Sequence, residues 1–396
     1  MDLKTKIEKL ANQYFPEIVN IRRHIHQHPE LSFEEYETSG FITRKLDEYG
    51  IAYKNNYVKT GIIGTITGKN PGKKTIALRA DMDALPVTEQ NDVPFKSVNT
   101  GVMHACGHDV HTSSLLGTAR ILNEIRNEWE GTVLLIFQPG EEKLPGGAKL
   151  MIEEGALDNP KPDIVIGQHV LPGLEAGKVG FKSGMYMAST DEIYITVKGK
   201  GGHAAMPHQL IDPVVIASHI IVALQQIVSR QANTLIPSVL SFGKIEAKGA
   251  TNVIPNEVKI EGTFRTFNET WRINAHKKII KLAQSVAEGM GGDCEINIMS
   301  GYPFLVNNEE VTEKSIRMTK QILGDKNVVD LDIRMTAEDF AYYSQKYPST
   351  FYRLGIMDKN GNLSSSLHSP TFNIDESALE TGMKTMAWLA VSFLSD

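Results

Sequence analysis

Short apolar runs alternate with helical patterns over residues 51–181, and this alternation restricts the fold more than any other feature of the sequence. The apolar runs occupy residues 75–78, 133–137 and 164–167, and a helical pattern over residues 110–125 separates the first two. Strands joined through helices pair in parallel, because each helix returns the chain to the same edge of the sheet. The pattern predicts an α/β domain with a mostly parallel sheet.

From residue 191 the order changes to strand, helix, strand, strand, helix, strand, which is the order of a ferredoxin-like domain. We expect its strands at residues 193–198, 239–247, 258–266 and 295–299, and its helices at residues 213–230 and 272–290. The chain of 396 residues is longer than one domain usually is, so two domains are expected. We predict a catalytic domain made of residues 1–186 and 304–396, with residues 187–303 inserted as a lid or dimerisation domain.

The charge and the termini exclude several classes of partner. The net charge is −6 and no basic tract is present, so we expect neither nucleic acid nor a membrane surface as a partner. Residues 1–20 form an amphipathic pattern without the apolar core of a secretion signal, and no apolar run reaches about 18 residues. Two cysteines make no disulfide framework, and a cytoplasmic protein is expected.

Four short segments carry thiol, imidazole and carboxylate groups: residues 104–109, 139–142, 168–170 and 367–370. A soft thiolate, borderline imidazoles and hard carboxylates together suit zinc, manganese, cobalt or nickel, whereas calcium and magnesium prefer oxygen ligands. The four segments therefore predict a site for divalent ions of the first transition row.

The position of these groups along the chain points to catalysis. Cys106 and His108 precede the helical pattern, where the positive end of the helix dipole is expected to lower the pKa of the thiol. Glu141 and Glu142 follow the carboxyl end of a buried strand, and active sites of parallel sheets form where the carboxyl ends of the strands meet. Because the two residues are adjacent, their side chains should diverge, so one can bind metal while the other transfers a proton. Ligands from separated segments meet only in a folded domain, which is typical of a catalytic site and unlike a zinc finger.

Each residue taken alone has a structural explanation that competes with a functional one. His24, His26 and His28 lie near the end of an amphipathic helix, and we exclude them from the ligand set. Cys106 alone could be a small buried hydrophobe, and Cys294, which has no partner motif, keeps that interpretation.

Together, the motifs resemble those of metal-dependent amidohydrolases of the aminoacylase and carboxypeptidase-G family. The most similar branch contains hippurate hydrolases, N-acetyl-diaminopimelate deacetylases and indole-acetyl-amino-acid hydrolases. The resemblance extends almost end to end, from residues 28–32 through residues 79–86 and the four segments to the loop of His368.

The resemblance implies a site with two divalent ions. Its implied ligands are Cys106, which would bridge the ions, with His108, Glu142, His169 and His368. It makes Glu141 the general base. Related peptidases have a supporting aspartate at the position of Asp83, so Asp83 is expected to orient a ligand and not to bind metal.

Two positions depart from the pattern of the branch. Alanine is frequent where this chain has Gly140, and the segment Glu338-Asp339 follows Thr336-Ala337 where Gly-Ser is frequent. Glu338 and Asp339 could orient a ligand, or Thr336 could cap a helix with Asp339 in its first turn. The sequence leaves both interpretations open.

Residues of the inserted domain are candidates for contacts with the substrate. Residues 199–205 are rich in glycine but lack the Gly-Lys-Ser/Thr ending of a phosphate loop, and the resemblance assigns His203 to the oxyanion, across a dimer interface. Asn252 and Arg265 are candidates to bind a substrate carboxylate, which the planar guanidinium suits. Arg265 could instead form a surface ion pair, and Asn252 could serve a turn.

The expected activity is hydrolysis of the amide bond of N-acetyl- or N-benzoyl-type amino acids by a water that bridges two metal ions. The products would be a carboxylic acid and a free amino acid, and the resemblance implies a homodimer formed through the lid. One alternative is a dinuclear di- or tripeptidase. Others are a cysteine amidase with Cys106 as nucleophile and His108 as base, and a metal-binding protein without catalysis.

Overall fold

The computed structural model describes residues 2–359, 361 and 365–395. By the contacts between Cα atoms, the chain forms two compact units. The larger unit comprises Met1–Tyr186, Val306–Ile333 and Asp339–Asp396, and the smaller unit comprises Met187–Leu305 with Arg334–Glu338. The smaller unit is therefore an insertion in the sequence of the larger one.

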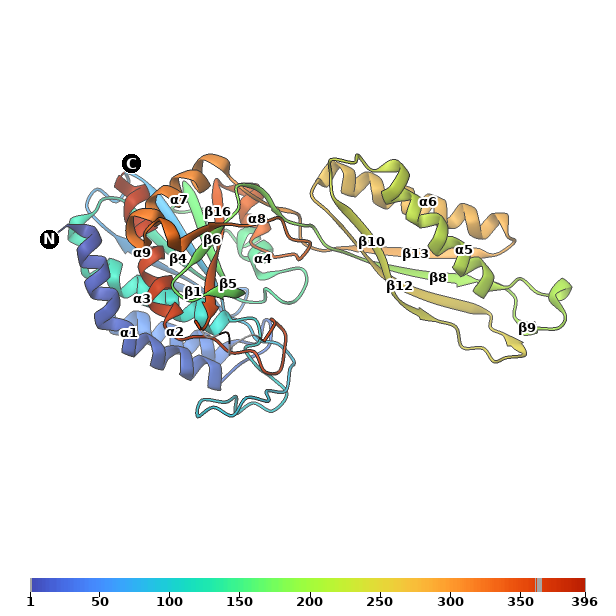
Figure 1. Ribbon diagram of the computed structural model, residues 1–396, viewed down its shortest axis with the longest axis horizontal. Helices are drawn as coiled ribbons and strands as arrows, with labels where there is room; N and C mark the ends of the chain where they lie inside the picture. The colour runs from blue at the N-terminus through green and yellow to red at the C-terminus, as the bar shows by residue number, and fades with distance from the viewer. Residues whose placement is uncertain (1, 360, 362–364, 396) are drawn as a thin grey trace. The chain divides into compact units, whose positions relative to one another are not determined.

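The larger unit is built on an eight-stranded sheet with the strand order β1-β2-β4-β3-β5-β16-β6-β15 (Figure 1). The strands are β1 (Ala52–Tyr57), β2 (Gly61–Thr67), β3 (Thr75–Asp81), β4 (Thr132–Gln138), β5 (Ile164–Glu175), β6 (Val179–Phe181), β15 (Val328–Asp330) and β16 (Ser349–Met357). The four central strands, β4, β3, β5 and β16, are parallel to one another, whereas β1 and β2 form an antiparallel pair at one edge. The predicted α/β class with a largely parallel sheet is confirmed.

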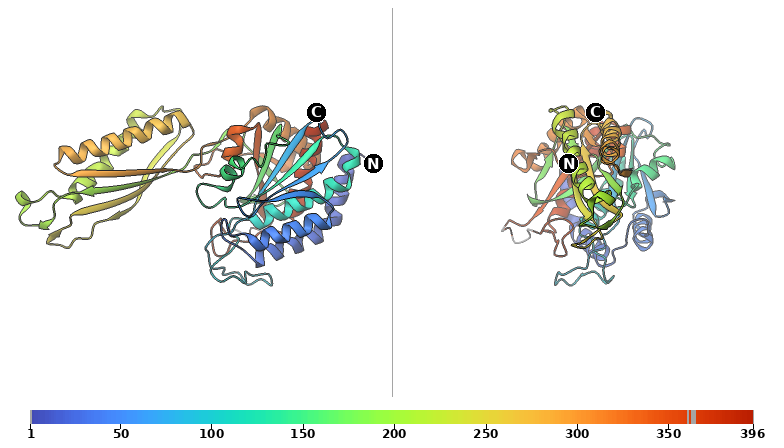
Figure 2. Two further views of the ribbon diagram at one scale, coloured as in Figure 1. Left: turned by 180° about the vertical axis from the view of Figure 1, so that it is seen from behind. Right: turned by 90° about the vertical axis from the view of Figure 1, so that its right-hand side faces the viewer.

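Helices cover the sheet and form most of the second layer. They are α1 (Leu3–Gln27), α2 (Tyr36–Glu48), α3 (His108–Glu124), α4 (Gly147–Glu153), α7 (Glu309–Leu323), α8 (Ala341–Lys346) and α9 (Ala378–Ser395). Helices α3 and α9 pack against β3, and α1 packs against both of these helices, as the view from behind also shows (Figure 2). The amphipathic pattern at the N-terminus thus forms one long helix that lies on α3 and α9.

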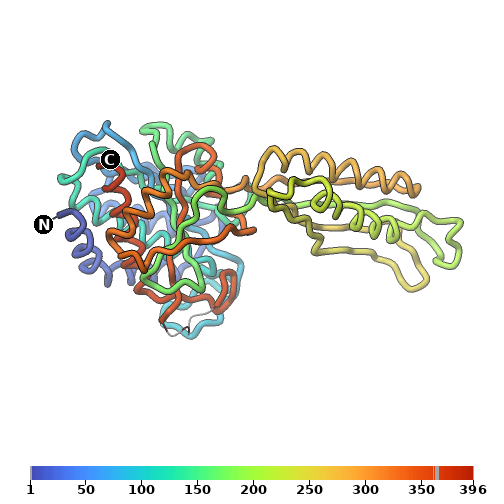
Figure 3. Tube along the Cα trace, turned by 45° about the horizontal axis from the view of Figure 1, so that its top comes forward, coloured from blue at the N-terminus to red at the C-terminus, as the bar shows by residue number. Residues whose placement is uncertain are grey.

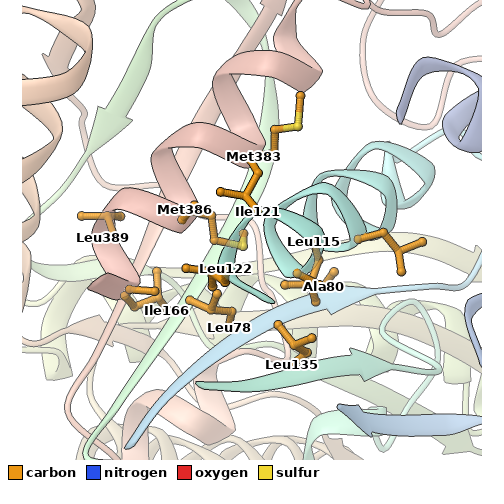
Figure 4. Packing of buried hydrophobic residues seen from close by; sticks show 14 of the residues in the cluster. Leu78, Ala80, Leu115, Ile121, Leu122, Leu135, Ile166, Met383, Met386 and Leu389 are labelled. Atoms are coloured by element: carbon orange, nitrogen blue, oxygen red, sulfur yellow. The ribbon is translucent and has the colours of Figure 1, made fainter. Parts of the chain in front are cut away.

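The core of the larger unit lies between the sheet and the pair α3 and α9 (Figure 4). Leu78 and Ala80 of β3 face Leu115 of α3 and Met383 and Met386 of α9, and all five side chains are fully buried. A fully buried leucine or methionine contributes about 1.5–3 kcal/mol to folding. This packing fixes the start of α3 relative to the end of β3, where the candidate site lies.

The smaller unit has the predicted ferredoxin-like order. Its elements are β8 (Asp191–Lys198), β9 (Gly202–His203), α5 (Pro213–Gln226), β10 (Ser238–Glu246), β11 (Val253–Ile254), β12 (Glu257–Thr266), α6 (Glu269–Gly289) and β13 (Asp293–Ser300). The main sheet has the order β10-β12-β8-β13 and is antiparallel throughout. Strands β7 (Gly184–Met187) and β14 (Leu305–Asn307) lie where the chain passes between the units.

Helices α5 and α6 run side by side along one face of this sheet (Figure 3). Ile216, Ile220 and Leu224 of α5 are buried against the sheet, whereas Val215 and Val222 are exposed. Among the described residues, the stretch Pro213–Gln231 alone is long and apolar enough to cross a membrane by length and composition. A single such helix is weak evidence for a span, because core helices pass the same test.

A buried ion pair fastens the start of β8 to α6. The guanidinium of Arg272 donates to Asp191 Oδ1 at 2.6 Å and to the carbonyl oxygens of Thr190 and Gly301, both at 3.0 Å. His276 Nε2 lies 2.8 Å from Asp191 Oδ2. Arg272 thus links both ends of the inserted segment, near residues 190 and 301.

We predict that Arg272→Met lowers the free energy of unfolding of the smaller unit by about 3 kcal/mol, because it leaves the buried Asp191 carboxylate with only His276 as a partner. Urea unfolding combined with hydrogen exchange of the β8 and β13 amides would measure the loss. Arg230→Met, at an exposed position of the same unit, is the control and should leave stability within about 0.5 kcal/mol of the wild type. Equal stability of the two variants would contradict the role of the ion pair.

Candidate active site

The carboxyl ends of three parallel strands supply the frame of the site. Strand β3 ends at Asp81, opposite Gln138 at the end of β4, and β5 carries His169 at the corresponding edge. Cys106 lies on the loop that enters α3, whose first residue is His108. Parallel strands place their carboxyl ends along one edge, which is where ligands bind in open α/β sheets.

The five sequence-predicted ligands come together at this edge. Cys106 Sγ lies 3.5 Å from His169 Nε2, and Glu142 Oε1 lies 3.3 Å from His368 Nε2. Cys106, Glu142 and His368 offer ligand atoms within 4.8 Å of one another, and so do Cys106, His108 and His169. Because Cys106 belongs to both groups, the arrangement has the form of two adjoining sites that share a sulfur atom.

A backbone carbonyl sets the tautomer of His169. Its Nδ1 lies 2.8 Å from the carbonyl oxygen of Val170, which can only accept, so the proton is on Nδ1 and the Nε2 lone pair points towards Cys106. Burial and the positive charge of Arg353 hold the pKa of His169 well below its usual value. His169 is therefore a neutral imidazole, the form that binds metal.

Asp83 supports two of the predicted ligands without facing the site itself. Its Oδ1 lies 3.2 Å from His108 Nδ1, and its Oδ2 accepts from the backbone N–H of Glu142 at 2.9 Å and from Ser32 Oγ at 2.6 Å. The opposite ring nitrogen, Nε2 of His108, is buried and makes no hydrogen bond to any residue that the structure describes. Such an orphaned nitrogen, held towards a cluster of carboxylates, fits a metal ligand.

Behind the ligands lie Arg79, Asp81 and His111, whose supporting role was not identified from the sequence. Asp81 receives Arg79 Nη1 at 2.6 Å and His111 Nδ1 at 2.5 Å. The backbone N–H of Val170 donates to His111 Nε2 at 2.9 Å, so both nitrogens of His111 are engaged and the ring is a brace, not a ligand. The signal available in the sequence was a pair of charged residues, Arg79 and Asp81, on an otherwise apolar strand.

Asp339 also lies behind the ligands and bonds Arg79. It accepts from Arg79 Nη2 at 2.8 Å, from Gln138 Nε2 at 2.8 Å and from the backbone N–H of Ala148 at 2.9 Å. Helix α8 begins only at Ala341 and has no side-chain cap, so the helix-cap interpretation of Thr336 and Asp339 is wrong. Asp339 instead orients Arg79, and through it Asp81, while Glu338 is buried at the end of a segment of the smaller unit.

The expected lowering of the Cys106 pKa is wrong for this environment. Burial, followed by the carboxylates of Glu142 and Glu141, raises the pKa of the thiol well above its usual value. The helix dipole is the weaker effect because several acidic groups share one buried space with the sulfur. A cluster of this kind is compensated by bound cations, and the mixture of sulfur, nitrogen and oxygen donors fits divalent ions of the first transition row.

Glu141 is buried beside the predicted ligands. One of its carboxylate oxygens lies within 4.8 Å of a ring nitrogen of His108 and of an oxygen of Glu142. The turn that presents it contains Gly140 with φ of +61°, the left-handed region in which glycine is favoured. The ring of Phe33 occupies the space where a Cβ of residue 140 would lie, which explains the departure from alanine.

The carboxylate of Glu35 supports the turn that contains Gly140. Its Oε1 accepts from the backbone N–H of Gly140 at 2.8 Å and its Oε2 accepts from Thr60 Oγ1 at 2.7 Å. Burial, followed by the nearby Asp83 carboxylate, raises the pKa of Glu35 to about 7. Glu35 was not identified from the sequence, because a pair of adjacent glutamates such as Glu34 and Glu35 is common on solvated turns and has no distinguishing pattern.

In the smaller unit the structure brings two of the three predicted residues together. His203 in β9 pairs with Val253 in β11, and the N–H of Ala204 donates to the carbonyl of Asn252. His203 Nδ1 accepts from the N–H of Ala205 at 3.2 Å, so Nε2 carries the proton on an exposed ring. This histidine is thus a hydrogen-bond donor with an exposed side chain.

Arg265 lies on β12 of the four-stranded sheet, at the end of that strand away from the two-stranded β9 and β11 ribbon. It is near the C-terminal end of β12, half-buried, and its Nη1 donates to the carbonyl of Met335 at 3.0 Å. From Glu257, beside the β9 and β11 ribbon, to Arg265 the strand advances eight residues at about 3.3 Å each, roughly 26 Å. His203 and Arg265 of one chain are therefore too far apart to hold one small molecule.

Comparison with known proteins agrees with this geometry. Residues 77–392 match the profile described as peptidase family M20/M25/M40. The chain is 41% identical over 363 residues to the N-acetyl-L-cysteine deacetylase of Bacillus subtilis, covering 92% of this chain and 85% of the relative. It is 39% identical over 399 residues to the IAA-amino acid hydrolase ILR1-like 2 of Arabidopsis thaliana, covering 100% and 89% of the two chains.

A solved structure shows the same fold with a related sequence. The Bacillus subtilis YXEP protein, described as a dinuclear metal-binding peptidase of the M20 family, superposes with a TM-score of 0.84 and 36% identity. The superposition covers 97% of this chain and 99% of that chain.

We predict that Gly140→Ala lowers the free energy of unfolding by about 2 kcal/mol and reduces turnover, because φ of +61° costs about 1–2 kcal/mol for alanine and the Phe33 ring must move. The double variant Phe33→Ala/Gly140→Ala removes the clash and should recover part of the turnover. Additive losses in this double-mutant cycle would contradict the contact.

Stability should fall as pH rises from 4.5 to 7, because the Glu35 carboxyl loses its proton near pH 4.5 in the unfolded chain but only near pH 7 in the folded one. The loss is fully present above pH 7 and amounts to about 3 kcal/mol. Glu35→Gln removes it, so urea unfolding at several pH values should show a flatter profile than that of the wild type. Glu34→Gln, at an exposed neighbouring position, should keep the wild-type profile.

Proposed function

Because the chain belongs to peptidase family M20/M25/M40, and its relatives include an N-acetyl-L-cysteine deacetylase and an IAA-amino acid hydrolase, we propose that it hydrolyses the amide bond of N-acyl amino acids. The products are a carboxylic acid and a free amino acid. The chain is a hydrolase of this family, and the proposal concerns its substrate class and the roles of its residues.

The observation that carries the proposal is the convergence of five donor groups beside one further buried glutamate. In this proposal, two divalent ions (zinc, manganese, nickel or cobalt) are bound by Cys106, His108, Glu142, His169 and His368. When bound, such ions lower the pKa of a water molecule and polarise a carbonyl group. Asp83 acts by fixing the ring of His108 and the backbone of Glu142.

Glu141 is the general base and then the general acid. It removes a proton from the attacking water and returns that proton to the nitrogen of the departing amino acid. Its burial beside His108 and Glu142 supports this assignment, because proton transfer needs contact with the reacting atoms and exclusion of bulk solvent.

Three residues of the smaller unit complete the site in this proposal. His203 donates its Nε2–H to the oxyanion, and it does so in the site of the second chain of a homodimer. Arg265 binds the carboxylate of the substrate, and Asn252, which lies beside His203, is the second residue assigned to that carboxylate. The separation of His203 from Arg265 within one chain supports this division, because one chain cannot place both on one substrate.

A dimer through the smaller unit is supported by its surface. Val214, Val215 and Val222 of α5 are exposed on a helix that is apolar around most of its circumference, and burial of such side chains favours association.

Both cysteines, Cys106 and Cys294, are free thiols, which supports a reducing location such as the cytoplasm.

An acylated amino acid is favoured over an unblocked peptide as the substrate. A relative at 41% identity is named for an N-acetylated amino acid, and one at 39% identity for an indole-acetyl conjugate. A thiol mechanism is disfavoured because the Cys106 side chain is buried among carboxylates that raise its pKa.

We predict that Glu141→Gln lowers kcat on N-acetyl and N-benzoyl amino acids by about 10²–10⁴-fold while the metal content stays close to that of the wild type. Turnover and elemental analysis on the same preparations would measure both quantities. Glu153→Gln, an exposed glutamate of α4, is the matched control and should change neither.

Unchanged turnover of Glu141→Gln would refute the assigned base. A wild-type enzyme that cleaves unblocked dipeptides but no acylated amino acid would refute the substrate class. Full activity after removal of metal by a chelator, combined with inactivation by iodoacetamide, would replace the proposal by the thiol mechanism.

A further inference from the structure

Four charged side chains outside the ligand set are buried together in the larger unit: Arg22, His26, Glu89 and Asp109, called here the His26 cluster. Arg22 Nε donates to Asp109 Oδ2 at 2.7 Å, and His26 Nδ1 lies 2.8 Å from the same oxygen. The other ring nitrogen, His26 Nε2, lies 3.1 Å from Glu89 Oε1. One imidazole thus joins two carboxylates that come from different parts of the chain.

The charges of the His26 cluster balance. Both nitrogens of His26 face carboxylate oxygens at 2.8 and 3.1 Å, and the guanidinium Nη2 of Arg22 lies farther from Nδ1, at 3.3 Å, so the contacts favour donation from both nitrogens and the imidazolium form. Burial and Arg22 oppose this charge, but the bonds to Asp109 and Glu89 outweigh them and raise the pKa of His26. Two cations then face two anions, which makes burial of all four tolerable. Both ring nitrogens are occupied, so His26 has no lone pair for a metal.

One end of the cluster holds the first ligand loop. Asp109 follows His108 directly and lies in the first turn of α3. Arg22 and His26 are four residues apart on α1, so they lie on one face of that helix and reach the same carboxylate. The position of the Cys106 and His108 loop is therefore tied to α1 through Asp109.

The other end of the cluster reaches the segment that carries His368. Asn91 donates from Nδ2 both to Glu89 Oε1 at 3.0 Å and to the carbonyl of Phe372 at 2.9 Å. The backbone N–H of Gln90 donates to the carbonyl of Pro370 at 2.8 Å. The chain around Glu89 is thus bonded at two points to the residues that follow His368.

We propose that His26 is a positioning residue that sets the separation between the Cys106 and His108 loop and the His368 segment, an inference that rests on the proposed metal-dependent function. Among the residues that the structure describes, a direct hydrogen bond joins these segments at one point, where the N–H of His368 donates to the carbonyl of Ala105 at 2.8 Å. Through Asp109 and Glu89, His26 supplies a further connection, beside the one made by Arg22, whose Nε bonds Asp109 and whose Nη1 lies 3.6 Å from Glu376 Oε1. Several connections fix a distance and an orientation where one fixes a distance alone.

Two variants separate this role from the electrostatics of burial. His26→Gln leaves the cluster with one unbalanced negative charge, whereas His26→Gln/Glu89→Gln is again balanced but cannot bridge as the imidazolium does. His24→Gln is the matched control, since His24 lies on the same helix, is exposed and stacks on Phe41 with ring centroids 4.3 Å apart.

The measurement uses the full chain freed of metal and titrated with cobalt(II) alone. Cobalt affinity by competition with a chelator, the near-ultraviolet band of thiolate-to-cobalt charge transfer and the midpoint of thermal unfolding are recorded for each protein. We expect the balanced double variant to unfold near the wild-type temperature, to bind cobalt about 10-fold more weakly and to show an altered charge-transfer band. His24→Gln should match the wild type in all three.

Wild-type affinity and an unaltered cobalt spectrum in His26→Gln and in the double variant would overturn the proposal, and so would losses that scale only with the unfolding midpoint. These outcomes differ from a failure of the proposed function, in which the wild type itself would bind no cobalt or hydrolyse no N-acyl amino acid. In that case both proposals would fall.

Discussion

The buried guanidinium of Arg79 is the interaction on which the geometry of the site depends. It lies at the end of a fully buried strand and bonds Asp81, Asp339 and Gln138, which come from separate elements of the larger unit. An arginine without these partners would be prohibitively costly at this depth, so the three acceptors and the guanidinium fix one another. Asp81 in turn positions His111, whose second nitrogen holds the backbone of Val170 and with it the segment of His169.

The ligands are therefore held in place by a network of hydrogen bonds between residues that take no part in catalysis themselves. Asp83 and the His26 cluster have the same supporting role. They bond to the ligand residues, or to the loops that carry them, and are not ligands themselves. The ligand residues are thus held by charged residues that already have partners of opposite charge. This arrangement leaves the lone pair of His169 and the Nε2 atom of His108 turned towards the space where the donors converge.

Much of this could be predicted from the sequence, and the limits have physical causes. The alternation of strands and helices and the donors placed at strand ends are local patterns, so the α/β class and the ferredoxin-like order were predicted correctly. The partners of Asp81 and Asp339 lie up to 260 residues away, and no local pattern reports such contacts. The pKa of Cys106 was predicted with the wrong sign, because the helix dipole is visible in the sequence whereas the acids that gather around the sulfur are not.

The contact between Phe33 and Gly140 has a consequence for how such chains diverge. The aromatic ring fills the volume that any larger residue at position 140 would need. A methyl group at position 140 is compatible with this turn only when the ring at position 33 is absent or displaced. The two positions, 107 residues apart, should therefore covary during evolution, with glycine retained in lineages that keep the aromatic ring and alanine fixed where it has been lost.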